Sequence, residues 1–133
     1  MSVALVPVVS FPAPAEATHE VSHHYVVLGY VRDDATHRPI AGGTVEVVRE
    51  KTGFRYLAQP DTGGFYVVVV HLHDEDLLDS LRVTAGRATI RIQARFNPLN
   101  ARSPRGTRVD FTGGSVVERQ EIFAETVNDY LKR

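Results

Sequence analysis

Two histidines and three acids lie together in the stretch HLHDED, residues 71–76. His71 and His73 are two positions apart, so on a β-strand both side chains point to the same face. Asp74 follows directly, and imidazole nitrogens combined with a carboxylate form a donor set suited to zinc or copper. The spacing therefore permits a metal site, provided that further ligands converge on the same point.

A second pair, His23 and His24, stands at the start of the first predicted strand. If the ends of the two strands meet, these residues could complete a copper or zinc site with His71, His73 and Asp74. The competing interpretation is that the HxH pair marks the place where an apolar strand leaves the core and enters water. The sequence favours this second interpretation, because an HxH pair alone is a weak indicator of metal binding.

Catalytic constellations are missing from the remainder of the sequence. Adjacent carboxylates occur at 33–34 and 74–76, in turn-like segments where Asp is expected for its backbone hydrogen bonds. No serine has the context of a nucleophile elbow, and no glycine-rich segment has that of a phosphate-binding loop. The chain has no cysteine, which excludes thiol catalysis, disulfides and iron–sulfur clusters. We therefore predict a non-enzymatic protein with no cofactor other than copper or zinc at the histidines.

Length and charge narrow the classes of partner. A chain of 133 residues with a net charge of −1 corresponds to one domain and offers no basic surface for nucleic acid. No run of about 18 apolar residues is present, so no membrane-spanning helix is expected. Residues 1–22 are apolar and then rich in proline and alanine, without lysine or arginine. They are predicted to be either an extended arm or a degenerate export signal.

β-Strand patterns dominate from residue 24 onward. Short runs rich in β-branched and aromatic residues recur between turn signals every 8–12 residues or so, as is typical of a β-sandwich. In 88–96, Ile90 and Ile92 are expected to point inward while Arg91, Gln93 and Arg95 point outward. The seven predicted strands are 24–32, 44–48, 54–59, 65–72, 81–85, 88–96 and 107–111. We predict an all-β, seven-stranded Greek-key sandwich domain over residues 23–114.

The segment 115–133 loses the period of two and is predicted to be a C-terminal helix or tail. Ser115 followed by Glu118 fits a capping box, and the apolar residues that follow lie on one helical stripe. The predicted helix begins between 115 and 123. The alternative is a last strand through VVERQEIF, which alternates poorly.

The strand 65–72 is apolar on both faces, whereas a sandwich strand normally buries one. We therefore expect its second face to be covered by the terminal helix, by the N-terminal arm or by another protein chain. The residues predicted to take part in this packing or in binding a partner are Phe65, Val67, Val69, Phe123, Val127, Tyr130 and Leu131.

A family resemblance rests on the stretch VLGYVRDDATHRPIAGGTVEVV, residues 27–48, followed by KTG and PDTGGFYVVV. Its matching positions include Gly29, Asp33, Pro39, Gly42 and Gly64. This stretch resembles the carboxypeptidase regulatory-like domain, an Ig-like/transthyretin-like sandwich. The resemblance implies an accessory, non-catalytic domain outside the cytoplasm. Hydroxyisourate hydrolases share that scaffold but end in Tyr-Arg-Gly-Ser, whereas this chain ends in DYLKR.

Together these patterns predict an exported, periplasmic or extracellular interaction module. Its expected partner is a larger protein complex or further copies of the same chain. The alternative is a periplasmic protein that binds copper or zinc through His71 and His73.

Overall fold

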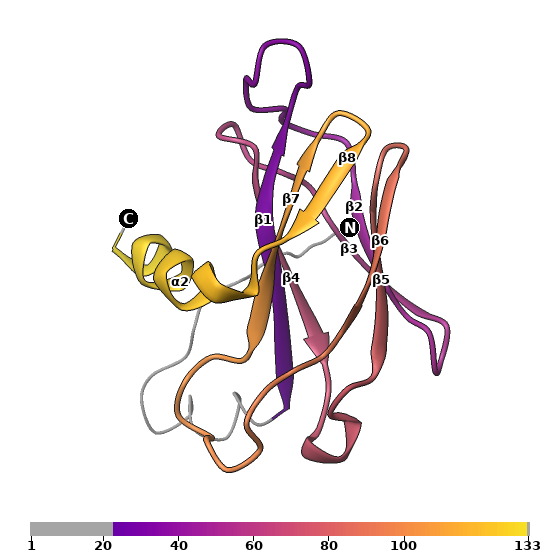
Figure 1. Cartoon of the computed structure of the whole chain (residues 1–133), viewed down its shortest axis with the longest axis vertical. Coiled ribbons are helices and arrows are strands. Elements are labelled where there is room, and N and C mark those ends of the chain that lie inside the picture. Colours follow the sequence, from indigo (N-terminus) through magenta and orange to yellow (C-terminus); the bar gives the residue numbers. More distant parts are fainter. Residues whose placement is uncertain (1–22, 133) are drawn as a thin grey trace.

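The computed structural model describes residues 23–132, which form eight strands and a C-terminal helix (Figure 1). The single-turn 3-10 helices η2 and η3 lie in the connections before β5 and before α2. In chain order the elements are β1 (His24–Arg32), β2 (Val45–Arg49), β3 (Phe54–Ala58), β4 (Phe65–His71), η2 (Asp74–Asp76), β5 (Ser80–Ala85), β6 (Ala88–Gln93), β7 (Gly106–Thr112), β8 (Ser115–Glu118), η3 (Gln120–Ile122) and α2 (Phe123–Leu131).

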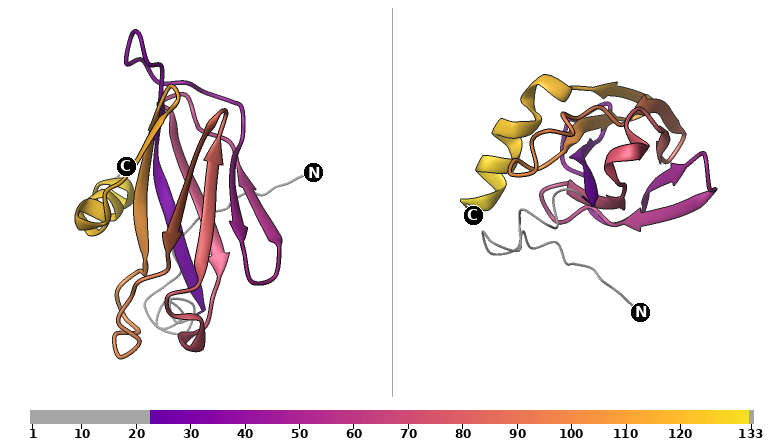
Figure 2. Two further views of the ribbon diagram at one scale, coloured as in Figure 1. Left: turned by 45° about the vertical axis from the view of Figure 1, so that its right-hand side comes forward. Right: turned by 90° about the horizontal axis from the view of Figure 1, so that it is seen from below.

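The strands form two four-stranded sheets, with orders β4-β1-β7-β8 and β3-β2-β5-β6. All neighbouring pairs are antiparallel except β1 and β7, which run parallel. The sheets face each other as two layers, and α2 lies outside the first of them (Figure 2). The expectation of an all-β sandwich with a C-terminal helix is therefore confirmed, and the number of strands is corrected from seven to eight.

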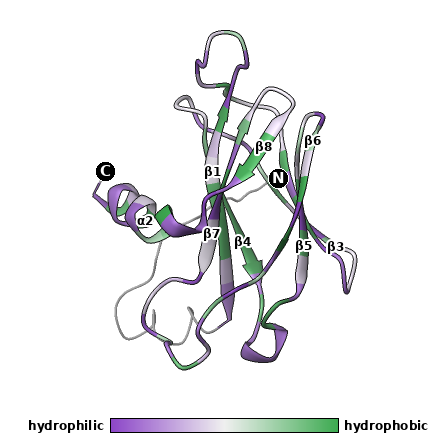
Figure 3. Ribbon diagram, in the orientation of Figure 1, coloured by the Kyte–Doolittle hydropathy of each residue, from purple (hydrophilic) through white to green (hydrophobic). Residues whose placement is uncertain are grey.

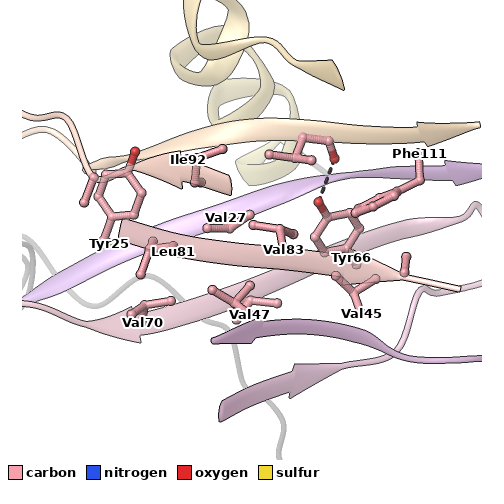
Figure 4. Close-up of a cluster of buried hydrophobic side chains, with 14 of the residues drawn as sticks. Tyr25, Val27, Val45, Val47, Tyr66, Val70, Leu81, Val83, Ile92 and Phe111 are labelled. Carbon is pink, nitrogen blue, oxygen red and sulfur yellow. Dashed lines mark hydrogen bonds between the residues drawn. The ribbon is translucent and has the colours of Figure 1, made fainter. Parts of the chain in front are cut away.

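The main core lies between the two sheets and is made of inward-facing residues from both. Val27, Val47, Val70 and Val83 are fully shielded from solvent there. Apolar residues are concentrated in the strands, and the loops are mostly polar (Figure 3). The Tyr66 hydroxyl donates a hydrogen bond of 2.6 Å to the backbone oxygen of Val109 across this core (Figure 4). Its polar atom is thus satisfied where water is excluded.

The capping box predicted at Ser115 and Glu118 is wrong, because both residues lie in β8. Ser115 pairs with Thr112 in β7, and Gly113, at φ +60°, allows the tight hairpin turn between them. Glu118 accepts a hydrogen bond of 2.8 Å from the Thr107 hydroxyl. Pairing with β7 supplies backbone hydrogen bonds that the weak alternation of the sequence did not reveal. The α-helix itself begins at Phe123, the last position of the predicted range.

The helix α2 covers the second apolar face of β4. The terminal helix was one of the three candidates expected to cover this face. Phe123 and Val127 of the helix pack with Val26, Leu28 and Phe65 in a second buried cluster. Val67 and Val69 are partly buried at its border. No helix within residues 23–132 is long and apolar enough to cross a membrane.

Candidate functional site

Four histidines meet at one end of the β1–β4 pair. The antiparallel register places His24 directly opposite His71, and the Leu72 N–H donates a hydrogen bond of 2.9 Å to the His23 backbone oxygen. The ring centroids of His71 and His73 are 4.6 Å apart, and those of His23 and His73 are 4.7 Å apart. His23 and His71 are separated by 6.1 Å, and His24 and His71 by 6.3 Å. The structure thus brings together all four predicted histidine ligands, which we call the histidine cluster.

Asp74, the predicted carboxylate ligand, is engaged elsewhere. Its Oδ1 forms an ion pair of 2.7 Å with Arg105, whose side chain is only 3% exposed. The Arg105 guanidinium also lies 4.4 Å from the centre of the Phe96 ring. A buried cation strongly requires a counter-charge, so Asp74 satisfies Arg105 rather than the histidines. In this structure Asp74 thus forms an ion pair with Arg105 and is not grouped with the histidines.

Asp76 fixes the loop that follows the histidines. Its carboxylate accepts a hydrogen bond of 2.9 Å from the His73 N–H and forms an ion pair of 2.8 Å with Arg49. Asp79 pairs with the same guanidinium at 2.8 Å. Burial acts to raise the pKa of Asp76, but the His73 hydrogen bond and the Arg49 charge outweigh it and hold the pKa below its ordinary value. Asp76 therefore holds the backbone of His73 in place.

The histidine rings are close, but their nitrogens do not converge as they stand. Within residues 23–132 no three or more His, Asp or Glu side chains are arranged to hold a metal ion. His71 is exposed, whereas His23, His24 and His73 are half-buried, so solvent reaches the cluster. The arrangement offers imidazole nitrogens at an accessible site, with ring rotation needed before three of them could share one ion.

The predicted apolar partner surface is largely buried within the chain itself. Phe65, Phe123 and Val127 are 4%, 6% and 3% exposed, because α2 is amphipathic and packs its apolar side on the first sheet. Val67, Val69 and Tyr130 are half-buried at the edge of this contact. Leu131, at 54% exposed, is the one member of the predicted set that remains on the surface. These contacts leave little of the predicted surface for another protein.

A row of arginines crosses the outer face of the second sheet, and sequence reasoning did not identify it. Arg55 and Arg82 both lie opposite Val48, and Arg82 lies opposite Arg91. Their side chains are 66%, 48% and 67% exposed. We call Arg55, Arg82 and Arg91 the arginine row. The alternation within each strand indicates that its arginine points outward. Only the pairing of the strands shows that the three arginines form one row.

Two glutamates partly neutralise the arginine row. Glu46 pairs with Arg55, while Glu50 is shared between Arg82, at 3.6 Å, and Arg91, at 2.9 Å. Like charges directly opposite each other in a sheet are unfavourable, so the Arg82–Arg91 pair depends on this shared carboxylate. The row therefore retains positive charge on its exposed face.

The opposite side of the molecule carries an acidic stripe formed by Glu121, Glu125 and Asp129. These residues are four apart along η3 and α2 and all are exposed, whereas Phe123 and Val127 face the sheet. This spacing places Glu125 and Asp129 on one face of α2, and Glu121 lies in η3, just before that helix. Because α2 packs outside the first sheet and the arginine row lies outside the second, the two charged surfaces face away from each other (Figure 2).

The other perturbed titratable groups have structural explanations. Burial raises the pKa of the Tyr25 and Tyr66 hydroxyls, which lie in the main core. Hydrogen bonds from the backbone and side chain of Thr36 lower the pKa of Asp33 in the exposed turn after β1. None of these groups belongs to the histidine cluster or to the arginine row.

Comparisons with known proteins add little to this geometry. No family model matches the chain, and no curated protein matches it. Among solved structures, the chain is similar to the dioxygenase domain of a dioxygenase–carbohydrate-binding protein fusion from the cellulolytic bacterium Streptomyces sp. SirexAA-E. The TM-score is 0.38 and the sequences are 16% identical, over 73% of this chain and 76% of the other. A likeness at this level assigns neither a family nor an activity.

Proposed function

We propose that this chain is a non-enzymatic, exported interaction module that assembles with further copies of itself through its two charged surfaces. The observation that carries the proposal is the placement of the arginine row and the acidic stripe on opposite sides of one sandwich. Its two four-stranded sheets are compatible with the transthyretin-like, Greek-key class that the sequence resembles. Domains of that class commonly serve as accessory modules, which is consistent with this role.

The two surfaces have similar dimensions. Neighbouring strands are about 4.8 Å apart, so the row from Arg55 to Arg91, which spans three strand spacings, is roughly 14 Å long. The stripe from Glu121 to Asp129 spans eight residue steps, two in η3 and six in α2, so its length is at most about 13 Å at rises of about 2.0 and 1.5 Å per residue. The two lengths are similar, but the arginines are unevenly spaced, with about 10 Å between the strands of Arg55 and Arg82 and about 5 Å between those of Arg82 and Arg91. The long, exposed arginine side chains must therefore adjust to meet three carboxylates.

The contact joins different patches of the two copies, so it is head-to-tail rather than two-fold symmetric. Contacts of this kind form rings if the rotation closes and open chains if it does not. Each exposed ion pair contributes only about 0.2–1 kcal/mol. Three such pairs together contribute at most about 3 kcal/mol, and Glu46 and Glu50 already share the arginines. We therefore expect weak association, with a Kd of about 5 mM or weaker at low salt.

Sedimentation velocity of the full chain at low and high salt tests this proposal. The wild-type protein should associate with increasing concentration at low salt and dissociate at high salt. Arg82→Glu and Glu125→Arg should each abolish association, because each places like charges in the contact. A matched control, Arg102→Glu, changes an exposed arginine outside the row and should have no effect.

Charge exchange makes the test specific. Mixing Arg82→Glu with Glu125→Arg should restore association at one-to-one stoichiometry, with the two variants alternating. The altered row of one fits the altered stripe of the other, and their unaltered surfaces also fit each other. A wild-type protein that stays monomeric at millimolar concentration would overturn the proposal. Association that is unchanged in both variants would overturn it as well.

A further inference from the structure

We propose that His23, His71 and His73 form a binding site for one divalent transition-metal ion, copper or zinc, at the end of the β1–β4 pair. The inference rests on the histidine cluster and is independent of the charged surfaces. Imidazole nitrogens suit both metals, and copper is expected to bind more tightly than zinc at the same nitrogen ligands.

The separations between the rings fit three ligands around one ion. A metal–nitrogen distance of about 2.0–2.1 Å places each ring centroid about 3.2 Å from the ion, and tetrahedral angles then separate the centroids by about 5 Å. The separations of 4.6, 4.7 and 6.1 Å lie on both sides of this value. These separations are compatible with three ligands around one ion, and convergence of the nitrogens requires the rings to rotate about their side-chain torsions.

The backbone beneath these histidines is already fixed. Residues 71 and 72 are held by pairing with β1, and the Leu72 N–H bonds the His23 oxygen. The His73 N–H bonds Asp76, which Arg49 anchors to β2. Ligands that are held in this way lose little backbone freedom when an ion binds.

Three imidazole ligands leave a fourth position for water or for His24. His24 lies 6.3 Å from His71, so its ring is within the same cluster. Asp74 is not included in the proposed site, because its Oδ1 pairs with the buried Arg105 at 2.7 Å. The site thus corresponds to the open three-histidine type rather than to a closed structural site.

Isothermal titration of the full chain with copper(II) sulfate and with zinc chloride, in a non-coordinating buffer, tests the site. One equivalent should bind the wild-type protein. The double variant His71→Ala/His73→Ala should weaken binding by at least about 100-fold, since loss of even an outer-shell partner costs 10–100-fold. The variant His24→Ala distinguishes three histidine ligands from four. An unchanged metal affinity would mean that three histidines bind the ion, and a lower affinity would identify His24 as the fourth ligand.

Two matched controls remove a histidine from elsewhere in the chain. His37→Asn alters a residue at φ +58° in the turn after β1 with a side chain that tolerates this conformation, and His19→Ala alters a residue outside the described part. Both should bind metal as the wild type does. Absence of binding to the wild-type protein would overturn the inference, and so would binding that survives the double variant. The Arg82→Glu variant should retain full metal binding, which separates failure of this site from failure of self-assembly.

Discussion

Asp76 joins the loop of the histidine cluster to the core, and its removal tests how the cluster is positioned. Asp76→Asn keeps the shape of the side chain and an oxygen that can accept the His73 N–H, but removes the charge that pairs with Arg49 at 2.8 Å. Asp76→Ala removes both interactions. The difference between the two variants therefore isolates the contribution of the hydrogen bond to His73.

The expected cost follows from the partners that remain. Removing one partner from a buried ion pair costs about 3–5 kcal/mol, but Arg49 retains Asp79, with hydrogen bonds of 2.8 and 3.1 Å. A hydrogen bond to a charged group contributes about 1.5–3 kcal/mol. We therefore expect Asp76→Asn to lower the free energy of unfolding by about 2 kcal/mol and Asp76→Ala by about 3 kcal/mol.

The effect should depend on pH in a defined direction. The pKa of Asp76 is lower in the folded state, so its ionised form stabilises the fold above the unfolded pKa of about 3.9. That contribution is lost as the pH falls through the folded pKa, where both states become protonated. The difference in stability between the wild type and Asp76→Asn should be complete at pH 7 and should shrink below about pH 4.

Urea unfolding monitored by circular dichroism measures these differences, with stability read from the midpoint at constant m-value. Glu75→Gln is the matched control, because Glu75 is an exposed acid in the same loop, and its cost should stay within about 0.5 kcal/mol. If Asp76→Asn costs no more than Glu75→Gln at pH 7, the ion pair with Arg49 does not support the loop. A difference that grows at low pH would show that the direction of the pKa shift is wrong.

Three further substitutions probe the two cores, each measured by thermal and urea unfolding. Gly106→Ala should lower the free energy of unfolding by about 1–3 kcal/mol or more, because an added Cβ would lie 2.0 Å from the Val26 oxygen and 2.6 Å from the Phe123 ring. A stability equal to that of the wild type would contradict this close approach. Phe123→Ala should cost about 3 kcal/mol and speed amide exchange in α2, whereas unchanged exchange would mean that the helix is held by other contacts. Tyr66→Phe should cost about 1–3 kcal/mol by leaving the Val109 carbonyl unsatisfied, and a neutral effect would show that this hydrogen bond is not needed.

Strand positions were predictable because alternation and turn residues are local properties. The apolar run 65–72 and the alternating run 88–96 both appear as strands close to the expected bounds. The strand β8 was only the less favoured alternative, because its four residues are stabilised by pairing with β7 rather than by their own pattern. Short edge strands depend in this way on a neighbour that the local sequence does not identify.

The candidate sites were likewise only partly predictable from local sequence. The types and the spacing of His71 and His73 indicated metal chemistry, but only the register of β1 with β4 brought His23 and His24 beside them. The role of Asp74 could not be predicted, since Arg105 lies 31 residues away along the chain. The arginine row likewise exists only when three strands are aligned across a sheet.

The sequence alone determined that this chain forms a β-sandwich and that its apolar strand 65–72 needs a cover on both faces, because hydrophobic periodicity is encoded residue by residue. The tertiary structure decided which surfaces remain accessible to solvent. It directed α2 onto that strand, paired Asp76 with Arg49 and Asp74 with Arg105, and brought the histidines together at one end of the sheet, where solvent reaches them. These outcomes depend on contacts between distant segments, whose energies no local pattern specifies.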